Sequence, residues 1–380
     1  MKIVRFGIIG CGLMGREFAS AAARWCHLPR MQVRPQIVAV CDTNDALMGW
    51  YVENVDTIGQ STTDYKDLLV NDAVEAVYVA VPHNLHQQIY CDVISAGKDL
   101  LGEKPFGIDK PANDAIVACI AAHPDVFVRC TSQFPFTPPM QRIGRMIEAD
   151  AFGRIIEVNS GFLHSSDLDP DKPINWKRMI DVNGEYGCMG DLGMHACHVP
   201  FRAGWRPKNV RAILLNIMPQ RPNAQGAVVP CETWDNATLL CEADDGGGHP
   251  FPLTIKTQRI APGEANTWYI EIKGTAACAR WSSKTPKLLE LLEYAGGEQV
   301  WRHIDMGQET AFESITGGIF EFGFSDAVLQ MWAGFLHERT AGRPISRFAG
   351  LVTPEETALS HKLFTAALQS QRDGTTVRVE

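Results

Sequence analysis

A short glycine pattern near the start of the chain constrains its fold more than any other feature. The segment Gly10-Cys11-Gly12-Leu13-Met14-Gly15 follows an apolar run over residues 3–10 and opens a stretch with helical apolar spacing. In a strand–turn–helix unit, Gly10 permits the tight turn, Gly12 lets a pyrophosphate approach the backbone, and Gly15 lets the helix pack against the strand. The pattern predicts a dinucleotide-binding fold in which residues 10–15 contact the cofactor; the alternative is a glycine-rich turn that binds nothing.

An aspartate ends the second apolar strand, which is predicted over residues 36–42. Asp42 lies 27 residues beyond Gly15, a separation that the insert His27–Gln36 lengthens. A carboxylate at this position accepts hydrogen bonds from the ribose hydroxyls of an adenosine and repels a 2′-phosphate. No arginine or lysine follows within residues 43–45 to bind such a phosphate. Asp42 therefore favours NAD over NADP as the cofactor, with a purely turn-forming aspartate as the alternative.

The strand and helix signals change character near residue 130. Before it, continuously apolar strands alternate with helices, as in a parallel sheet covered on both faces. Beyond it, few helices interrupt strands of partly alternating polarity, as in an antiparallel sheet with one packed face. The predicted strands cover residues 3–10, 36–42, 74–82, 99–103 and 126–130, then 154–164, 210–218, 237–242, 252–259, 268–273 and 277–281, with closing helices at 327–340 and 354–370.

This change predicts two domains, which suits a chain of 380 residues. We expect an α/β Rossmann domain that binds NAD over residues 1–130. An α+β domain with a large, mostly antiparallel open sheet is expected over residues 131–380.

Composition excludes several functional classes. The chain has 35 lysines and arginines against 44 aspartates and glutamates, a net charge of −9, whereas nucleic-acid binders normally carry a basic surplus. No apolar run reaches the ~18 residues that a membrane span needs. The 11 cysteines include no Cys-x-x-Cys pair, which predicts reduced, buried thiols rather than disulfides. Since the N-terminus also lacks the pattern of a signal peptide, we expect a cytoplasmic protein without nucleic-acid or membrane partners.

A second motif, Glu103-Lys104-Pro105, lies at the end of a predicted parallel strand. Residues 81–86 lie at the end of the preceding strand and just beyond it. Ligands bind at the carboxyl edge of such sheets. Five side chains at this edge are therefore candidates for cofactor contacts: Pro82, Asn84, His86, Glu103 and Lys104. A lysine in a closed site can also polarise an oxygen atom. The alternatives are a surface lysine before a turn proline, and a solvated histidine at position 86.

A third motif lies within residues 187–198, where Asp191 and His195 are four apart. On a helix they share a face, so that the carboxylate can fix the imidazole tautomer and the histidine can act as a general base. A buried structural histidine is the main alternative. A zinc site is a weaker one, and its ligands would be Cys188, Asp191, His195 and His198.

Together the three motifs resemble the Gfo/Idh/MocA family of oxidoreductases, named for glucose–fructose oxidoreductase and inositol dehydrogenase. The family pattern is an N-terminal dinucleotide fold, a strand ending in Glu-Lys-Pro, and a glycine-led Asp-x-x-x-His helix. The resemblance implies that Lys104, Asp191 and His195 are catalytic and also bind substrate. It adds His164 and the segment 175–178, with Trp176 and Arg178, as further substrate contacts.

The sequence also departs from the family pattern. His198 stands where the family often has an acid, and Cys188 and Met189 break the glycine run before Asp191. Phe134-Pro135-Phe136 replaces a segment that is commonly rich in arginine. These departures concern the substrate more than the fold or the cofactor.

The resemblance implies an NAD-dependent dehydrogenase that oxidises a secondary hydroxyl of a sugar, cyclic polyol or sugar derivative, without a metal. It also implies self-association as a dimer or tetramer through the open sheet, whose exposed face we expect to be apolar. One alternative is a glycosidase or lyase that oxidises the sugar transiently and regenerates its NAD. Another is a sugar-sensing regulator without catalytic activity.

Overall fold

The chain passes more than once between two structural units. In this computed structural model, which describes residues 1–307 and 309–380, unit 1 comprises Met1–Gly107, Pro111–Pro138 and Gly307–Pro354. Unit 2 comprises Ile108–Lys110, Pro139–Met306 and Glu355–Glu380. The sequence pattern predicts a single boundary after residue 130, with all later residues in the second domain. The return of the chain to unit 1 depends on contacts between distant segments, so it has no local sequence signal.

Unit 1 is built on a six-stranded sheet in which every strand pair is parallel. Its strands, in spatial order, are β3 (Gln60–Thr62), β2 (Val33–Cys41), β1 (Lys2–Ile9), β4 (Ala76–Val79), β5 (Asp99–Gly102) and β6 (Val128–Cys130). The chain progresses one way from β1 to β3 and the opposite way from β4 to β6, which leaves a switch point between β1 and β4. The predicted Rossmann fold is confirmed, and only the short strand β3 was not anticipated.

Helices connect these strands and complete the core of unit 1. They are α1 (Leu13–Ala23), α2 (Gly49–Asn54), α3 (Tyr65–Leu69), α4 (His86–Ser95), α5 (Lys110–Ala122) and α9 (Phe324–Ala341). Trp332 of α9 lies 4.9 Å from Phe6 of β1, and Phe18 of α1 stacks on Tyr78 of β4 at 4.0 Å between ring centroids. All four rings are buried. This aromatic core explains why α9 belongs to unit 1 despite its late position in the sequence.

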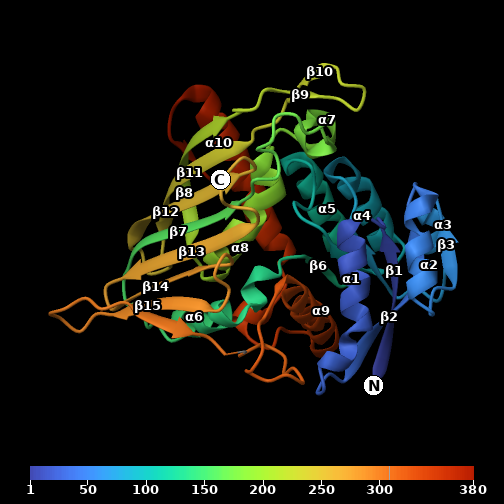
Figure 1. Ribbon diagram of the computed structural model, residues 1–380, viewed down its shortest axis with the longest axis horizontal. Helices are drawn as coiled ribbons and strands as arrows, with labels where there is room; N and C mark the ends of the chain where they lie inside the picture. Colours follow the sequence, from blue (N-terminus) through green and yellow to red (C-terminus); the bar gives the residue numbers. More distant parts are fainter. Residues whose placement is uncertain (308) are drawn as a thin grey trace. The chain divides into compact units, whose positions relative to one another are not determined.

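Unit 2 contains a nine-stranded mixed sheet (Figure 1). Its strands, in spatial order, are β16 (Arg302–Asp305), β15 (Leu288–Glu293), β14 (Ala277–Ser282), β13 (Thr267–Gly274), β7 (Ile155–Leu163), β12 (Pro250–Gln258), β11 (Asn236–Asp244), β8 (Arg206–Leu215) and β17 (Val377–Arg378). Only β7 and β12 pair in parallel; the other pairs described are antiparallel. Strands β9 (Gln220–Pro222) and β10 (Val228–Pro230) form a separate hairpin. The predicted, mostly antiparallel sheet is confirmed.

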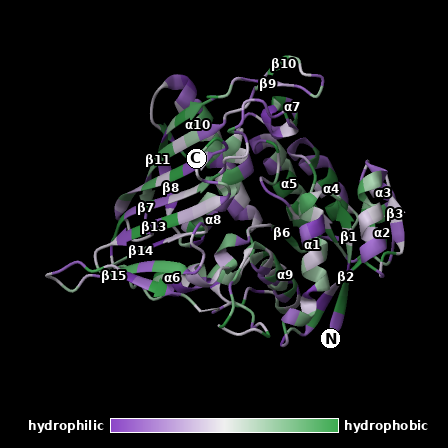
Figure 2. Ribbon diagram, viewed as in Figure 1, coloured by the Kyte–Doolittle hydropathy of each residue, from purple (hydrophilic) through white to green (hydrophobic). Residues whose placement is uncertain are grey.

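One face of this sheet is covered by helices of the same unit. Unit 2 contains α6 (Pro138–Glu148), α7 (Ile180–Asn183), α8 (Met194–Arg202) and α10 (Pro354–Asp373). Figure 1 shows α8 and α10 along the sheet, where Ser370 of α10 accepts a hydrogen bond from the backbone of Ala212 in β8. Buried and accessible residues alternate along β11, β12 and β13, and Figure 2 shows the matching alternation of hydropathy. No helix in the described ranges is long and apolar enough to cross a membrane.

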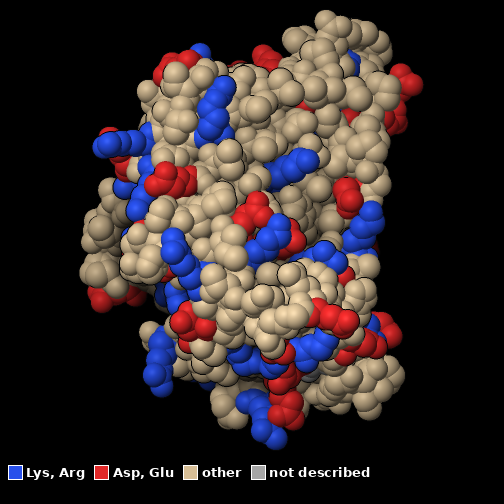
Figure 3. All heavy atoms as spheres, turned by 90° about the vertical axis from the view of Figure 1, so that its left-hand side faces the viewer, with Lys and Arg blue, Asp and Glu red and all other residues tan. Residues whose placement is uncertain are grey.

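The other face of the sheet is mixed in character, in contrast to the apolar face that the sequence led us to expect. Ile213 and Leu240 are exposed on neighbouring strands. On the far side of β7, Lys273 pairs with Glu157 at 2.6 Å and Arg280 with Glu290 at 2.6 Å. Figure 3 shows cationic and anionic side chains intermingled on the side of the molecule that lies at the left of Figure 1.

Candidate functional site

The glycine loop of unit 1 leaves space for a ligand on one side and packs closely against backbone atoms on the other. A Cβ atom on Gly10, whose φ is +98°, would lie 2.2 Å from the carbonyl oxygen of Ala80, and one on Gly15 would lie 2.3 Å from that of Gly10. Both positions therefore exclude a side chain. A Cβ on Gly12 would meet no described atom within 4 Å. Gly12 faces the open side of the loop, where a pyrophosphate can approach the backbone.

The N-terminus of α1 has the properties of an anion site. Gly12 is its N-cap, no side chain of the described residues caps it, and Leu13 in the first turn is 76% exposed. The first amide groups of a helix have no partner within the helix and carry a partial positive charge. A dinucleotide pyrophosphate would satisfy these groups and cover Leu13, so the residues fit the cofactor that the sequence predicts.

Asp42 follows β2 and is held against the glycine loop. Its Oδ2 accepts a hydrogen bond from the amide of Cys11 at 2.8 Å, and its Oδ1 accepts one from Asn44 at 2.8 Å. Each carboxylate oxygen keeps a second lone pair for a ribose hydroxyl. Asp42 therefore combines the turn-forming role and the geometry of a ribose acceptor. Burial and the charge of Asp42 raise the pKa of the Cys11 thiol to about 12, so this thiol stays neutral beside the loop.

The predicted cofactor contacts at the ends of β4 and β5 fall into two groups. Asn84 is exposed, and Pro82 and Lys104 are half-buried, so these three remain candidates. Glu103 is buried, and its Oε1 accepts a hydrogen bond from the hydroxyl of Tyr78 at 2.7 Å. His86 has no exposed surface. Because a cofactor cannot touch a fully covered side chain, the structure corrects the prediction that His86 contacts NAD.

In unit 2, Asp191 lies in a π-helical turn, Met189–Gly193, that leads directly into α8 and His195. Such turns are rare and occur often at functional sites. Pro200 within α8 has no amide proton for the carbonyl of Ala196. The hydroxyl of Ser160 in β7 donates to that carbonyl at 2.8 Å, and the indole of Trp268 in β13 donates to the carbonyl of His195 at 3.0 Å. Two strands therefore fix the backbone at His195.

Two cations bind the carboxylate of Asp191. The ammonium group of Lys177 lies 3.1 and 3.0 Å from its two oxygens, and the guanidinium of Arg259 donates to Oδ2. Arg259 also donates from Nε to Asp167 at 2.9 Å. Burial opposes the charge on Arg259, but the two aspartates raise its pKa above the ordinary value. Burial likewise opposes the charge on Asp167, but Arg259 holds the pKa of that carboxyl below its ordinary value.

The parallel pairing of β7 with β12 brings these groups together. Leu163 and Gln258 are paired at the ends of the two strands, so His164 and Arg259 follow at the same edge of the sheet. The ring of Phe162 meets the ring of His195 edge-on at 5.4 Å and that of His164 at 4.7 Å. Three predicted residues therefore lie in one region of unit 2: His164, Asp191 and His195.

The segment 175–178 presents a different side chain from the one expected. Arg178 has no exposed surface; its guanidinium bonds Asp235 at 3.0 Å and Asn216 at 2.7 Å. It has no surface for a substrate, so the structure corrects that prediction. Lys177 instead points to Asp191 with its side chain 30% exposed, and its ammonium lies 5.5 Å from the ring centroid of Trp176. The sequence did not single out Lys177, Arg259 or Asp167. The only local signal is that Arg259 is the last residue of one predicted strand and Asp167 lies just beyond the end of another.

The zinc interpretation finds no support in the geometry of the candidate ligands. Cys188 is fully buried, its thiol donates to the carbonyl of Thr257, and burial raises its pKa to about 12. His198 lies 3.6 Å from Glu356 of α10. Across the residues that the structure describes, no three His, Cys, Asp or Glu side chains form a cluster that could hold a metal ion.

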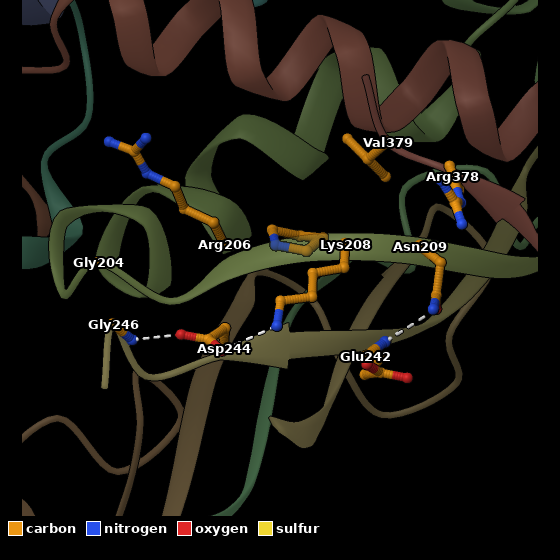
Figure 4. A pocket seen from close by; sticks show the side chains of 10 residues that line it. Gly204, Arg206, Lys208, Asn209, Glu242, Asp244, Gly246, Arg378 and Val379 are labelled. Atoms are coloured by element: carbon orange, nitrogen blue, oxygen red, sulfur yellow. Dashed lines mark hydrogen bonds and ion pairs between the residues drawn. The ribbon is translucent and has the colours of Figure 1, made fainter. Parts of the chain in front are cut away.

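A pocket of about 930 Å³ lies elsewhere in unit 2, at the edge formed by β8, β11 and β17. Figure 4 shows Lys208 paired with Asp244, at 2.8 Å, and Glu242 bonded through its amide to Asn209, at 3.2 Å. None of the predicted site residues lines this pocket. Its ion pair and hydrogen bonds are those of an ordinary charged surface, so we do not place the chemistry there.

Comparisons with known proteins agree with these observations. Residues 4–129 match an oxidoreductase family described by its NAD-binding Rossmann fold. Levoglucosan dehydrogenase of Pseudarthrobacter phenanthrenivorans is 26% identical over 299 residues, covering 72% of each chain. Inositol 2-dehydrogenase of Corynebacterium glutamicum is 25% identical over 158 residues, covering 41% of this chain and 44% of the relative.

The fold extends beyond the residues that the family match covers. The solved structure of levoglucosan dehydrogenase in complex with NADH and L-sorbose superimposes with a TM-score of 0.88 at 20% identity, covering 100% of both chains. Residues 4–129 therefore match the NAD-binding Rossmann domain of the Gfo/Idh/MocA oxidoreductases, and the rest of the chain shares the fold of levoglucosan dehydrogenase.

Proposed function

We propose that this oxidoreductase removes hydride from a secondary hydroxyl of a sugar, cyclic polyol or sugar derivative. The observation that carries the proposal is the surroundings of His195, a buried histidine fixed through its backbone beside the ion-paired Asp191. Alcohol oxidation needs a base of this kind, because hydride leaves carbon only as the hydroxyl proton departs. The relatives named as levoglucosan and inositol dehydrogenases support the substrate class.

In the proposed reaction, an imidazole nitrogen of His195 accepts the hydroxyl proton. The ammonium group of Lys104 stabilises the negative charge that develops on the substrate oxygen. Asp191 orients His195 and controls its tautomer, while Lys177 and Arg259 bind the Asp191 carboxylate. Residues 10–15 and Asp42 would hold NAD, which would supply the hydride acceptor for the substrate carbon. The assignment of Lys104, Asp191 and His195 to one catalytic unit rests on the motif resemblance and is tested by the kinetics below.

We propose that three further side chains of unit 2 bind substrate hydroxyls. His164 follows β7 and Arg259 follows its parallel neighbour β12, so both lie at the same edge of the sheet. Trp176 offers an aromatic face, and the side chain of Lys177 is partly exposed beside Asp191. Aromatic rings and charged donors are suited to polyhydroxylated ligands, since they combine apolar contact with directional hydrogen bonds.

The test is a substrate panel with purified protein and NAD. The panel contains levoglucosan, myo-inositol, common monosaccharides and sugar acids, and NADH is followed by its absorbance. We expect steady NADH production with at least one member. Substrate loss without net NADH would favour the glycosidase or lyase alternative, and NAD binding without turnover of any member would favour the regulator.

We also propose that the protein forms a homo-oligomer through the outer face of the nine-stranded sheet. The exposed Ile213, Leu215 and Leu240 on β8 and β11 provide apolar contact, and the ion pairs farther along the sheet provide a polar rim. Light scattering at micromolar concentration should give a multiple of 41.9 kDa. A mass equal to that of one chain would contradict the proposal.

A further inference from the structure

The turn that carries Lys104 is held at three backbone groups by buried side chains of unit 1. The hydroxyl of Tyr90 donates to the carbonyl of Glu103 at 2.7 Å. The amide of Asn113 donates to the carbonyl of Phe106 at 2.9 Å. The amide of Gly107 donates to Nδ1 of His86 at 3.4 Å. Lys104 therefore lies between two pinned residues, Glu103 on one side and Phe106 on the other.

His86 connects this turn to the end of the neighbouring strand. Its Nε2 lies 3.1 Å from the carbonyl oxygen of Val81, which follows β4. A carbonyl only accepts and an amide only donates, so the two contacts require a neutral ring with the proton on Nε2. The ring also stacks on Tyr90, with centroids 4.8 Å apart and an interplanar angle of 17°. One buried imidazole thus links the ends of β4 and β5 and supports the tyrosine that holds Glu103.

The turn needs such support because its backbone is unfavourable in isolation. Phe106 has a φ of +64°, a left-handed conformation that a bulky residue rarely adopts. Its ring is fully buried and lies 4.9 Å from that of Tyr90. The surrounding side chains therefore impose the conformation of the turn, and they impose the position of Lys104 with it.

We propose that His86 is a positioning residue for Lys104, acting through Gly107 and Tyr90. This inference rests on the proposed function only in that Lys104 is taken to act on the substrate oxygen. A catalytic group that is displaced by about 1 Å commonly loses about 100-fold in rate. His86 is then required for the reaction although it touches neither the cofactor nor the substrate.

The main variant is His86→Phe, which keeps a ring on Tyr90 and removes both hydrogen bonds. We expect kcat to fall by roughly 10- to 100-fold on the panel substrate with the highest rate, with NAD affinity unchanged. His86→Gln retains one donor and one acceptor on its terminal amide, and it should recover most of the lost rate. His123→Phe is the matched control, because His123 directly follows α5, far along the chain from the turn, and contacts the carbonyl of Cys119 at 2.9 Å.

A double-variant cycle separates positioning from a general loss of structure. In a Lys104→Ala background, His86→Phe should lower kcat little further, because the group that it positions is absent. If His86→Phe does not fold, Tyr90→Phe tests the same frame by removing only the hydroxyl bond to Glu103. Tyr65→Phe, which loses a 2.6 Å bond to Asp92, is its control.

A measurement without substrate completes the test. Reductive methylation with ¹³C-formaldehyde labels lysines, and the Lys104 signal is the one that Lys104→Ala removes. We expect His86→Phe, or Tyr90→Phe, to shift this signal, and His123→Phe to leave it in place. An unshifted signal, or full activity of folded His86→Phe while Lys104→Ala is inactive, would overturn the inference alone. Full activity of Lys104→Ala would instead overturn the proposed function.

Discussion

Units 1 and 2 assemble their functional groups in opposite ways. In unit 1, the dinucleotide loop is six consecutive residues, and Lys104 sits in a motif of three. In unit 2, the carboxylate of Asp191 meets Lys177, 14 residues away, and Arg259, 68 residues away. A phosphate site made of backbone amides needs a local conformation, whereas a buried ion-pair cluster needs partners from several strands and loops. Local motifs therefore predict the cofactor, and the tertiary fold determines the surroundings of the proposed general base.

The largest expected effect would come from removing one catalytic group in either unit. Lys104→Ala and His195→Ala should each lower kcat by roughly 10²- to 10⁴-fold, since each removes a group that acts in the transition state. NAD affinity, measured by titration, should barely change. The double variant should lose far less than the product of the two effects.

His249→Ala is the control for these variants, because His249 lies in an exposed loop where it pairs with Asp245 at 3.0 Å. Near-normal kcat in either Lys104→Ala or His195→Ala would show that the substituted residue has no part in the proposed chemistry.

Arg259→Met tests how much the ion-pair cluster around Arg259 contributes to the stability of the protein. It leaves Asp167 and Asp191 buried without their shared cation, which we expect to lower the free energy of unfolding by about 3–5 kcal/mol. Urea denaturation measures the change. Arg280→Met, which breaks a more exposed pair with Glu290 on the same sheet, should cost no more than about 1 kcal/mol. Equal losses in the two variants would contradict the distinction between a buried cluster and surface pairs.

Lys177→Met tests whether the exposed cation beside Asp191 serves the substrate. We expect kcat/KM to fall roughly 10- to 150-fold, because one charged hydrogen bond is worth roughly 1.5–3 kcal/mol. Lys172→Met removes the corresponding cation of Asp167, which lies at 3.4 Å, and should leave the kinetics close to normal. Steady-state kinetics that respond equally to both variants would indicate a general charge effect.

Asp42→Ser tests the cofactor preference that the local motif of unit 1 predicts. The substitution removes the repulsion toward a 2′-phosphate, so the preference for NAD over NADP should narrow by about ten-fold or reverse. Asp45→Ser changes the charge by the same amount three residues later and should leave the preference intact. Titration with NAD and with NADP measures the preference. Equal affinity of the wild-type protein for the two cofactors would refute the role assigned to Asp42.

The smallest expected effect is the contribution of Asp167 to acid stability. Its pKa is lowered by Arg259, so the stabilisation is complete above the ordinary value of 3.8 and is lost as the pH falls through the folded-state pKa. Asp167→Asn should flatten the acid limb of the unfolding free energy, by at most about 1.4 kcal/mol per pH unit. Asp169→Asn, two residues away and exposed, should keep the wild-type slope. Identical acid limbs for all three proteins would rule out this contribution.

Much of the site could be inferred before the fold was known, and the failures have a common cause. Gly10, Gly15 and Asp42 lie where their motif predicts, because their roles depend on the strand–turn–helix conformation itself. His86 and Arg178 were assigned to ligands from their place in a motif, yet both are fully buried. Residues of distant segments contribute to those surroundings: Gly107, in the turn after β5, contacts His86, and Asp235, just before β11, contacts Arg178.

The sequence alone determined the parallel first sheet, the predicted NAD-binding loop and the positions of Asp191 and His195, the proposed acid–base pair, one helical turn apart. Each of these depends on residues within about one helical turn or one strand–turn–helix unit. The tertiary structure decided that α9 returns to unit 1, and that β7 and β12 pair in parallel. It also decided that Lys177 and Arg259 share the carboxylate of Asp191. These outcomes depend on burial and on pairing across distant segments, which local patterns of polarity do not specify.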